Sequence, residues 1–262
     1  MFPRLTTLAK LFAADYWIVL DDVQFTRRDY QHRARLADLD DPARQQWLTI
    51  PTHLPNGRPT LIRDARIDDP ALACRRTAGM LRQHYGSSPH WPALAKALGP
   101  VLDAFTTGRT ATVAEISTRV LLDLLGWKGQ ILTSSQLPSR PGRSVRLADL
   151  SAATGARAYL CGTGGMTYLD PAPFAARNIA VAPFRPPLIN ICSSGRQLSA
   201  LWPLRLSARM PWPTGSRPSP PSTPSYSPPP DAAVPLLEEG DVPLNVPSRA
   251  RLRPAPSRTG CT

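Results

Sequence analysis

Proline divides the chain into two parts with different folding prospects. Fifteen of the 31 prolines lie in residues 203–262, and the other sixteen are spread over the first 202 residues. Proline fixes one backbone dihedral and lacks the amide N–H that helices and central strands need. Few large apolar residues follow residue 211 to form a core. We therefore predict a folded domain over residues 1–202 and a disordered tail over residues 203–262.

Helical and strand-like segments alternate within residues 1–202. The run YWIVL at residues 16–20 has no polar alternation, which is typical of strands buried in parallel sheets. The clearest helix spans residues 112–125, where apolar residues recur every three or four positions until Gly126. This order predicts an α/β fold with a Rossmann-like, mainly parallel sheet flanked by helices. The expected helices are residues 3–14, 70–85, 92–105, 112–125, 144–154 and 171–177, and the expected strands are residues 16–20, 47–50, 130–133, 158–161 and 179–183.

The positive charge of the chain does not by itself indicate a nucleic-acid partner. The formal net charge is +12, and all but three of the 31 basic residues are arginine. Arginine in place of lysine, with abundant alanine and proline, is the bias that a GC-rich genome imposes on any protein. No dense basic run is interleaved with aromatic residues. A basic nucleic-acid binder is therefore the weakest of the functional hypotheses for this sequence.

The spacing of cysteine and histidine predicts neither a zinc site nor a disulfide framework. The four cysteines are far apart, and the four histidines form no HxxxH motif. The apolar stretch at residues 11–20 contains Asp15 and ends at two aspartates, so it is too short and too charged for a signal peptide or a membrane span. We therefore expect a cytoplasmic protein without a membrane partner, and the sequence identifies no metal site and no cofactor.

Two adjacent carboxylates, Asp21 and Asp22, follow the run at residues 16–20. In open α/β sheets, ligands bind beyond the carboxyl ends of the strands. Carboxylates placed there can hold a metal, orient an amine or a ribose, or act as a general base. The alternative interpretation is that they are ordinary aspartates of a turn or a helix cap.

An arginine-rich segment, RRDYQHRAR, occupies residues 27–35. Guanidinium groups bind phosphate and carboxylate groups through paired hydrogen bonds. We therefore expect an anionic small-molecule substrate, linked to a nucleotide or a carrier. The alternative is a solvated charged surface.

Three glycines follow the strand expected at residues 158–161, in the segment YLCGTGGMTYLD. Glycine lets backbone amides approach a ligand, and clustered amides bind anions. The spacing matches neither the dinucleotide-binding motif nor the P-loop, so a plain tight turn is an equal alternative. Cys161 is expected to be an ordinary buried cysteine, and a nucleophile is the less favoured alternative. Ser134 and Ser135, after the strand at residues 130–133, are expected to cap a helix or bind phosphate.

Taken in order, the motifs LDDVQFTRRDYQHRARL, WLTIP, RQHYGSSPHW, LTSSQLP and YLCGTGGMTYLD resemble the WbqC-like family of bacterial proteins. The resemblance covers roughly residues 2–202, and the first and last motifs are its most specific parts. It implies a Rossmann-like core and a biosynthetic role beside genes for O-antigen, other surface polysaccharides or specialised metabolites. The activity it implies is transfer of an acyl or aminoacyl group to a sugar or a similar amine.

The resemblance also implies roles for individual residues. Asp21 or Asp22 would be the catalytic base or the anchor for an amine, and two arginines would clamp an anion. The glycine segment would form a backbone cradle for the substrate. The substrate-binding residues implied by the three motifs are Gln24, Arg28 and Arg33, then Ser135, then Gly162, Gly165, Tyr168 and Asp170.

The chain departs from the family at both ends. Family members usually begin with a strand that carries a His-Gln-Pro motif, and no such strand precedes FPRL at residues 2–5. Its loss would remove a sheet strand and a candidate catalytic histidine, so we expect a start codon assigned too late or an impaired protein. From about residue 205 we interpret the tail as a frameshifted translation. A non-catalytic binding or scaffold protein, or a truncated inactive family member, is therefore the main alternative to a transferase.

Overall fold

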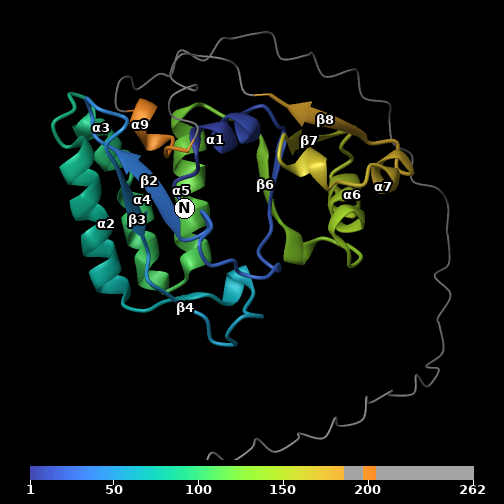
Figure 1. Ribbon diagram of the computed structural model, residues 1–262, viewed down its shortest axis with the longest axis horizontal. Coiled ribbons are helices and arrows are strands. Elements are labelled where there is room, and N and C mark those ends of the chain that lie inside the picture. The colour runs from blue at the N-terminus through green and yellow to red at the C-terminus, as the bar shows by residue number, and fades with distance from the viewer. Residues whose placement is uncertain (186–196, 205–262) are drawn as a thin grey trace, which may run out of the picture. The chain divides into compact units, whose positions relative to one another are not determined.

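The computed structural model describes residues 1–185 and 197–204, and two parallel strand pairs form the framework of this part of the chain (Figure 1). β1 (Tyr16–Val19) pairs with β6 (Gln130–Thr133), and β7 (Ala158–Gly162) pairs with β8 (Ala180–Phe184). Helices separate the strands of each pair along the chain, as parallel connections require. The expected α/β class, with parallel strands flanked by helices, is confirmed.

Two antiparallel pairs accompany the parallel ones in the described residues. β2 (Arg33–Ala37) pairs with β3 (Gln45–Thr49), and the short β4 (Thr52–His53) pairs with β5 (Arg66–Ile67). The sequence did not predict β2, because its RARLA pattern places arginines at alternate positions. Those arginines are half-buried on one face of the strand, whereas the intervening apolar residues are fully buried on the other.

The helices follow the expected apolar periodicity closely. The expected helix at residues 92–105 is the one that differs: it is split into two helices and a 3₁₀ turn. Pro100 causes the split, because it has no amide N–H for a continuing helix. The helices are α1 (Leu5–Phe12), α2 (Pro70–Tyr85), α3 (Trp91–Ala97), α4 (Gly99–Asp103), α5 (Thr110–Leu124), α6 (Arg143–Ala153), α7 (Ala172–Ala175) and α9 (Leu201–Leu204), with 3₁₀ turns η1 (Ile62–Asp64), η2 (Ala104–Thr107), η3 (Ser134–Gln136) and η4 (Gly165–Thr167).

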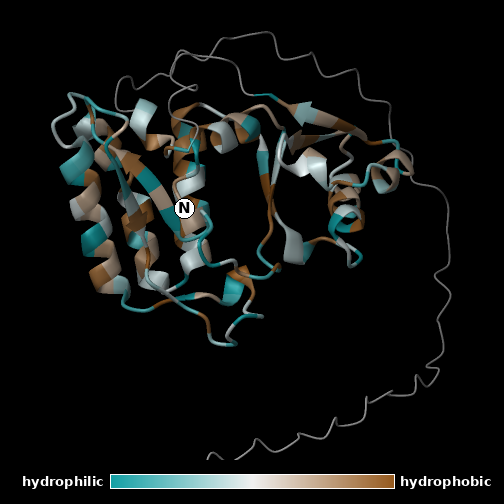
Figure 2. Ribbon diagram, in the orientation of Figure 1, coloured by the Kyte–Doolittle hydropathy of each residue, from teal (hydrophilic) through white to brown (hydrophobic). Residues whose placement is uncertain are grey.

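The main hydrophobic core surrounds α5, whose residues Val113, Leu121 and Leu122 are fully buried. Figure 2 marks the apolar stretches of the helices and strands in brown. β1 differs from expectation, since all four of its residues are only half-buried. Within residues 1–185 and 197–204 its one hydrogen-bonded neighbour is β6, so these residues do not enclose it as a central strand would be enclosed.

Residues 198–202 belong to the folded domain. The Ser199 amide donates a hydrogen bond to Arg35 O over 2.9 Å, and Trp202 Nε1 donates to Asp38 O over 2.9 Å. These contacts join the segment to β2 and to the loop that follows it. Residues 203 and 204 of the expected tail belong to α9, and residues 205–262 lie outside the described residues. The domain boundary near residue 202 therefore stays a prediction.

Candidate functional site

The two aspartates and the two serines lie at one edge of the β1–β6 pair. Asp21 and Asp22 follow β1, and Ser134 and Ser135 follow β6. The strands are parallel and Val19 is aligned with Thr133, so both loops leave the pair at its carboxyl end. The pairing of the strands therefore brings Ser135 beside the aspartates that the first motif contributes.

Hydrogen bonds join these two loops. Ser135 donates twice to Asp21: its amide to Oδ1 over 3.0 Å and its Oγ to Oδ2 over 2.8 Å. Ser134 Oγ lies 3.1 Å from Asp21 Oδ1 and also contacts Asp22 Oδ1. A hydroxyl carries one proton, so Ser134 donates to one carboxylate at a time. Ser135 thus binds Asp21 alone, whereas Ser134 contacts both carboxylates.

Arg146 of α6 adds the one positive charge among these contacts, through an ion pair between its Nη2 and Asp22 Oδ1. The two side chains are 21% and 19% exposed. Burial alone would raise the pKa of Asp22, but the hydrogen bond from Ser134 and the Arg146 guanidinium outweigh it, so the pKa is lowered from its ordinary value. We call Asp21, Asp22, Ser134, Ser135 and Arg146 the carboxylate cluster. Its formal charge at neutral pH is one negative unit.

Backbone contacts fix the position of the two aspartates. The Asp21 amide donates to Val19 O over 3.1 Å, and Asp21 O accepts from the Arg63 amide over 2.9 Å. Two residues further on, Val23 O accepts from the Ile62 amide over 2.9 Å. The 3₁₀ turn η1 therefore holds the segment that carries the carboxylates.

The glycine segment forms a tight turn against a buried thiol. A Cβ on Gly165 would lie 2.8 Å from Cys161 Sγ, whereas a Cβ on Gly162 would meet no atom within 4 Å. Gly165 O accepts hydrogen bonds from the amides of Tyr168 and Leu169. Close packing explains why glycine stands at residue 165, and the role of the segment as a substrate cradle stays a prediction.

The first turn of α6 links the glycine segment to the carboxylate cluster. The Arg143 guanidinium lies 5.5 Å from the centroid of the Tyr168 ring, and the Asp170 amide donates to Ser144 Oγ over 3.0 Å. Tyr168 is 63% exposed, which leaves its ring open to a ligand. Asp170 Oδ1 accepts from the Ala172 amide over 3.0 Å, at the start of α7.

The remaining predicted residues, Gln24, Arg28 and Arg33, make other contacts. Gln24 Nε2 donates to the carbonyl of Arg58 over 2.8 Å. Arg33 Nη2 donates to the carbonyl of Arg28, and its guanidinium lies 4.3 Å from the centroid of the Trp47 ring. Arg28 is exposed, and its backbone lies in the left-handed region with a φ of +68°. In the part of the chain that the structure describes, none of the three side chains forms a hydrogen bond or an ion pair with Asp21 or Asp22, and the anion clamp stays a prediction.

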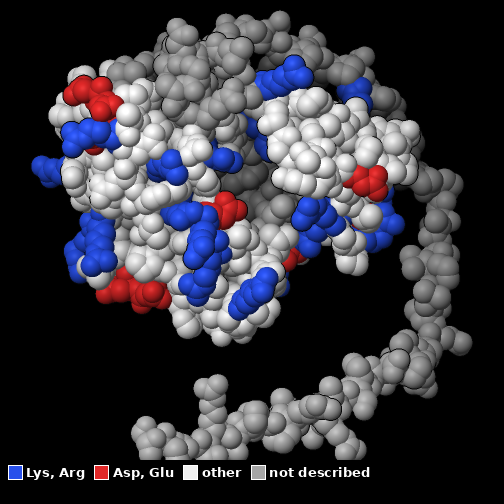
Figure 3. Space-filling model, in the orientation of Figure 1, with Lys and Arg blue, Asp and Glu red and all other residues white. Residues whose placement is uncertain are grey.

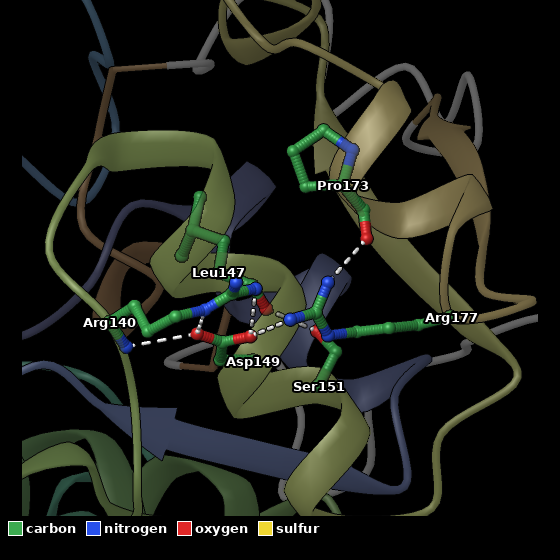
Figure 4. Close-up of polar contacts among 6 residues, drawn as sticks. All are labelled: Arg140, Leu147, Asp149, Ser151, Pro173 and Arg177. Atoms are coloured by element: carbon green, nitrogen blue, oxygen red, sulfur yellow. Dashed lines mark hydrogen bonds and ion pairs between the residues drawn. The ribbon is translucent and has the colours of Figure 1, made fainter. Parts of the chain in front are cut away.

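Sequence reasoning missed a second charged group beside α6, which we call the arginine–aspartate cluster: Arg140, Asp149 and Arg177 (Figure 4). Arg140 donates from Nε to Asp149 Oδ2 over 3.0 Å and from Nη2 to Oδ1 over 3.1 Å. Arg177 donates from Nη2 to Asp149 Oδ1 and from Nη1 to Pro173 O over 2.9 Å. The hydrogen bond from Arg140 is the largest cause that lowers the pKa of Asp149 to about 2.

Comparison with known proteins identifies the family. The family model of the WbqC-like protein family matches residues 1–188. The chain belongs to the WbqC-like protein family. A distant relative is "Uncharacterized protein Rv1507c" of Mycobacterium tuberculosis (strain ATCC 25618 / H37Rv), which is 27% identical over 175 residues, or 65% of this chain and 72% of the relative. No solved structure matches the chain significantly. The resemblance drawn from the motifs is confirmed.

Residues 1–185 and 197–204 of this WbqC-like protein contain no group of three or more His, Cys, Asp or Glu side chains arranged to hold a metal ion. None of their helices is long and apolar enough to cross a bilayer. On the face drawn in Figure 3, lysine and arginine side chains occur at several separate places, with acidic side chains between them. That view of the described surface shows no continuous basic stripe of the kind that follows a nucleic-acid backbone.

Proposed function

We propose that this WbqC-like protein is a cytoplasmic biosynthetic transferase that moves an acyl or aminoacyl group from an activated donor to an amine of a sugar or a similar acceptor. The carboxylate cluster is the observation that carries the proposal. It combines two carboxylates with one guanidinium at the carboxyl end of the β1–β6 pair. An acceptor amine is protonated at neutral pH, so its charge complements the net negative charge of the cluster.

The two carboxylates take different roles in this proposal. Asp22 stays ionised because of its contacts with Ser134 and Arg146, and it serves as the counter-ion of the acceptor ammonium. Asp21 is oriented by two hydrogen bonds from Ser135 and takes one proton from the ammonium, which leaves a neutral amine. The amine nitrogen then forms a bond to the acyl carbon, and the bond from that carbon to the leaving group breaks. The second amine proton goes to the leaving group.

The exposed groups around the cluster fit the binding of a larger acceptor. Ser135 is exposed and lies next to Asp21, where its hydroxyl can also meet a sugar hydroxyl. Across the first turn of α6, the exposed Tyr168 ring offers a flat apolar surface of the kind that sugar rings pack against. These residues come from the motifs that define the resemblance, and together they support a small-molecule acceptor.

A transfer assay tests the proposal. The full chain is incubated with nucleotide-linked amino sugars and with acyl and aminoacyl thioester donors, and new amides are detected by mass spectrometry. We expect product from the wild type and a loss of about 100-fold or more in Asp21→Asn and in Asp22→Asn. Asp123→Asn is the matched control, because Asp123 is an exposed carboxylate at the end of α5, close in sequence to the amino end of β6.

The outcome of the assay separates the two main hypotheses. Full product formation by folded Asp21→Asn and Asp22→Asn proteins would remove the proposed site. Tight binding of the amino sugar by the wild type without any transfer would favour the non-catalytic binding protein.

A further inference from the structure

The arginine–aspartate cluster lies outside the proposed acceptor site and has its own geometry. Figure 4 shows the side chains of Arg140 and Arg177 converging on the single Asp149 carboxylate. Arg140 comes from the loop between η3 and α6, Asp149 comes from α6, and Arg177 follows α7. The Arg140 side chain is 62% exposed and that of Arg177 is 24% exposed, whereas Asp149 is only 11% exposed.

One carboxylate cannot neutralise two guanidinium groups, so the arginine–aspartate cluster keeps one formal positive charge. Each guanidinium has several N–H donors in a fixed fork. Arg140 uses two of them on Asp149, and Arg177 uses one on Asp149 and one on Pro173 O. Both arginines are therefore oriented by protein contacts and retain further donors. Preorganised arginines with surplus charge are suited to a phosphate or carboxylate group.

The surface beside the cluster has room for such a group. Together with Pro138, Ser139, Ala152 and Ala153, the three charged residues line an open depression of about 480 Å³. The alanine side chains are small and neutral, and the serine hydroxyl can donate a hydrogen bond. Asp149 is the one acidic residue among the described residues that line it, and both of its oxygens already accept from arginine.

We propose that the arginine–aspartate cluster binds the phosphate group of a small-molecule substrate. A purely structural role would be to join the loop before α6 to the segment after α7. That role accounts for the contacts with Asp149, but it does not require the surplus positive charge of the cluster. Asp149 stands three residues after Arg146 on α6, so the two clusters of opposite net charge are about one helical turn apart along that helix. The assignment of this phosphate to a donor or acceptor of group transfer rests on the proposed function, whereas phosphate binding itself does not.

Phosphate binding is tested without any turnover. Inorganic phosphate, uridine diphosphate and phosphopantetheine are titrated into the full chain by calorimetry, at constant ionic strength maintained with chloride. We expect saturable binding to the wild type and a loss in affinity of about ten-fold or more in Arg140→Gln. Ala152→Glu places a negative charge at the depression without removing any of the three charged side chains, and should give the same loss. Arg119→Gln on α5 removes an exposed, ion-paired arginine elsewhere and should bind like the wild type.

The three probes distinguish the source of the phosphate. Tighter binding of uridine diphosphate supports a nucleotide-linked substrate, tighter binding of phosphopantetheine supports a carrier-linked one, and equal affinities support a site for the phosphate group alone. Absence of saturable binding to the folded wild type, or wild-type affinity in both Arg140→Gln and Ala152→Glu, would overturn the proposal. Because no acceptor amine is present, this result is independent of the transfer assay with Asp21 and Asp22 variants.

Discussion

Asp22, three residues after the end of β1, forms an ion pair with Arg146 of α6. About four-fifths of each side chain is buried. The pair joins the segment after β1 to α6, which follows β6, so it fixes the position of Asp22 within the carboxylate cluster. It also keeps Asp22 in its charged form, which is the property that the proposed function requires of it.

The Asp22–Arg146 pair should show energetic coupling in a double-mutant cycle. We expect Asp22→Asn and Arg146→Gln each to lower the free energy of unfolding at pH 7, and the double variant to lose less than the sum, with a coupling energy of about 1 kcal/mol. Urea denaturation measures these values. The exposed pair Glu115 and Arg119 is the control, with an expected coupling of about 0.3–0.5 kcal/mol. Additive effects at Asp22 and Arg146 would show that the ion pair does not hold the site.

Acid should remove the contribution of Asp149 to stability. Its pKa is lowered to about 2 in the folded protein, compared with about 3.9 in an unfolded chain. A lowered pKa means that the stabilisation is fully present above about pH 4 and is lost as the pH falls through about 2. We therefore expect Asp149→Asn to have a lower Tm than the wild type near neutral pH, and the gap to narrow between about pH 4 and about pH 2. A gap of constant size across this range would contradict the assignment.

Gly165 and Gly164 should respond differently to an added methyl group. A Cβ on Gly165 would lie 2.8 Å from the buried Cys161 Sγ, but a Cβ on Gly164 would have its nearest neighbour at 3.9 Å, the hydroxyl of Tyr168. We expect Gly165→Ala to lower the free energy of unfolding by about 1–3 kcal/mol through overpacking, and Gly164→Ala to change it little. Denaturant unfolding of the two variants checks this. Equal effects would mean that the thiol does not limit the space at residue 165.

The sequence predicts the place of the two aspartates because the controlling interactions are local. An unbroken apolar run predicts β1, and Asp21 follows it directly, so the position at a strand's carboxyl end needs no tertiary information. Ser135 likewise comes just after the end of a strand, two residues after the last residue of β6. Their contact requires that β1 and β6 be parallel neighbours. The α/β alternation predicts a mainly parallel sheet but does not predict which strands pair.

Other contacts could not be predicted, because tertiary packing decides them. The spacing of Arg146 and Asp149 shows that they share a side of α6, but the rotation of α6 about its axis determines which partners they meet. Arg177 reaches Asp149 from beyond α7, and no local pattern links the two. In β2, Arg33 was interpreted as a ligand-binding residue, and the structure shows that it also belongs to a strand and packs on Trp47.

Calorimetric titration of an amino sugar tests most directly whether the carboxylate cluster is the site for the acceptor amine. A nucleotide-linked amino sugar and its N-acetylated analogue are compared on the wild type, Asp21→Asn, Asp22→Asn and the control Asp123→Asn. We predict that the wild type and the control bind the amine at least about ten-fold more tightly than the amide, and that both cluster variants lose this preference. Equal affinity of the wild type for the two sugars, or an unchanged preference in folded Asp21→Asn and Asp22→Asn, would contradict the proposed function.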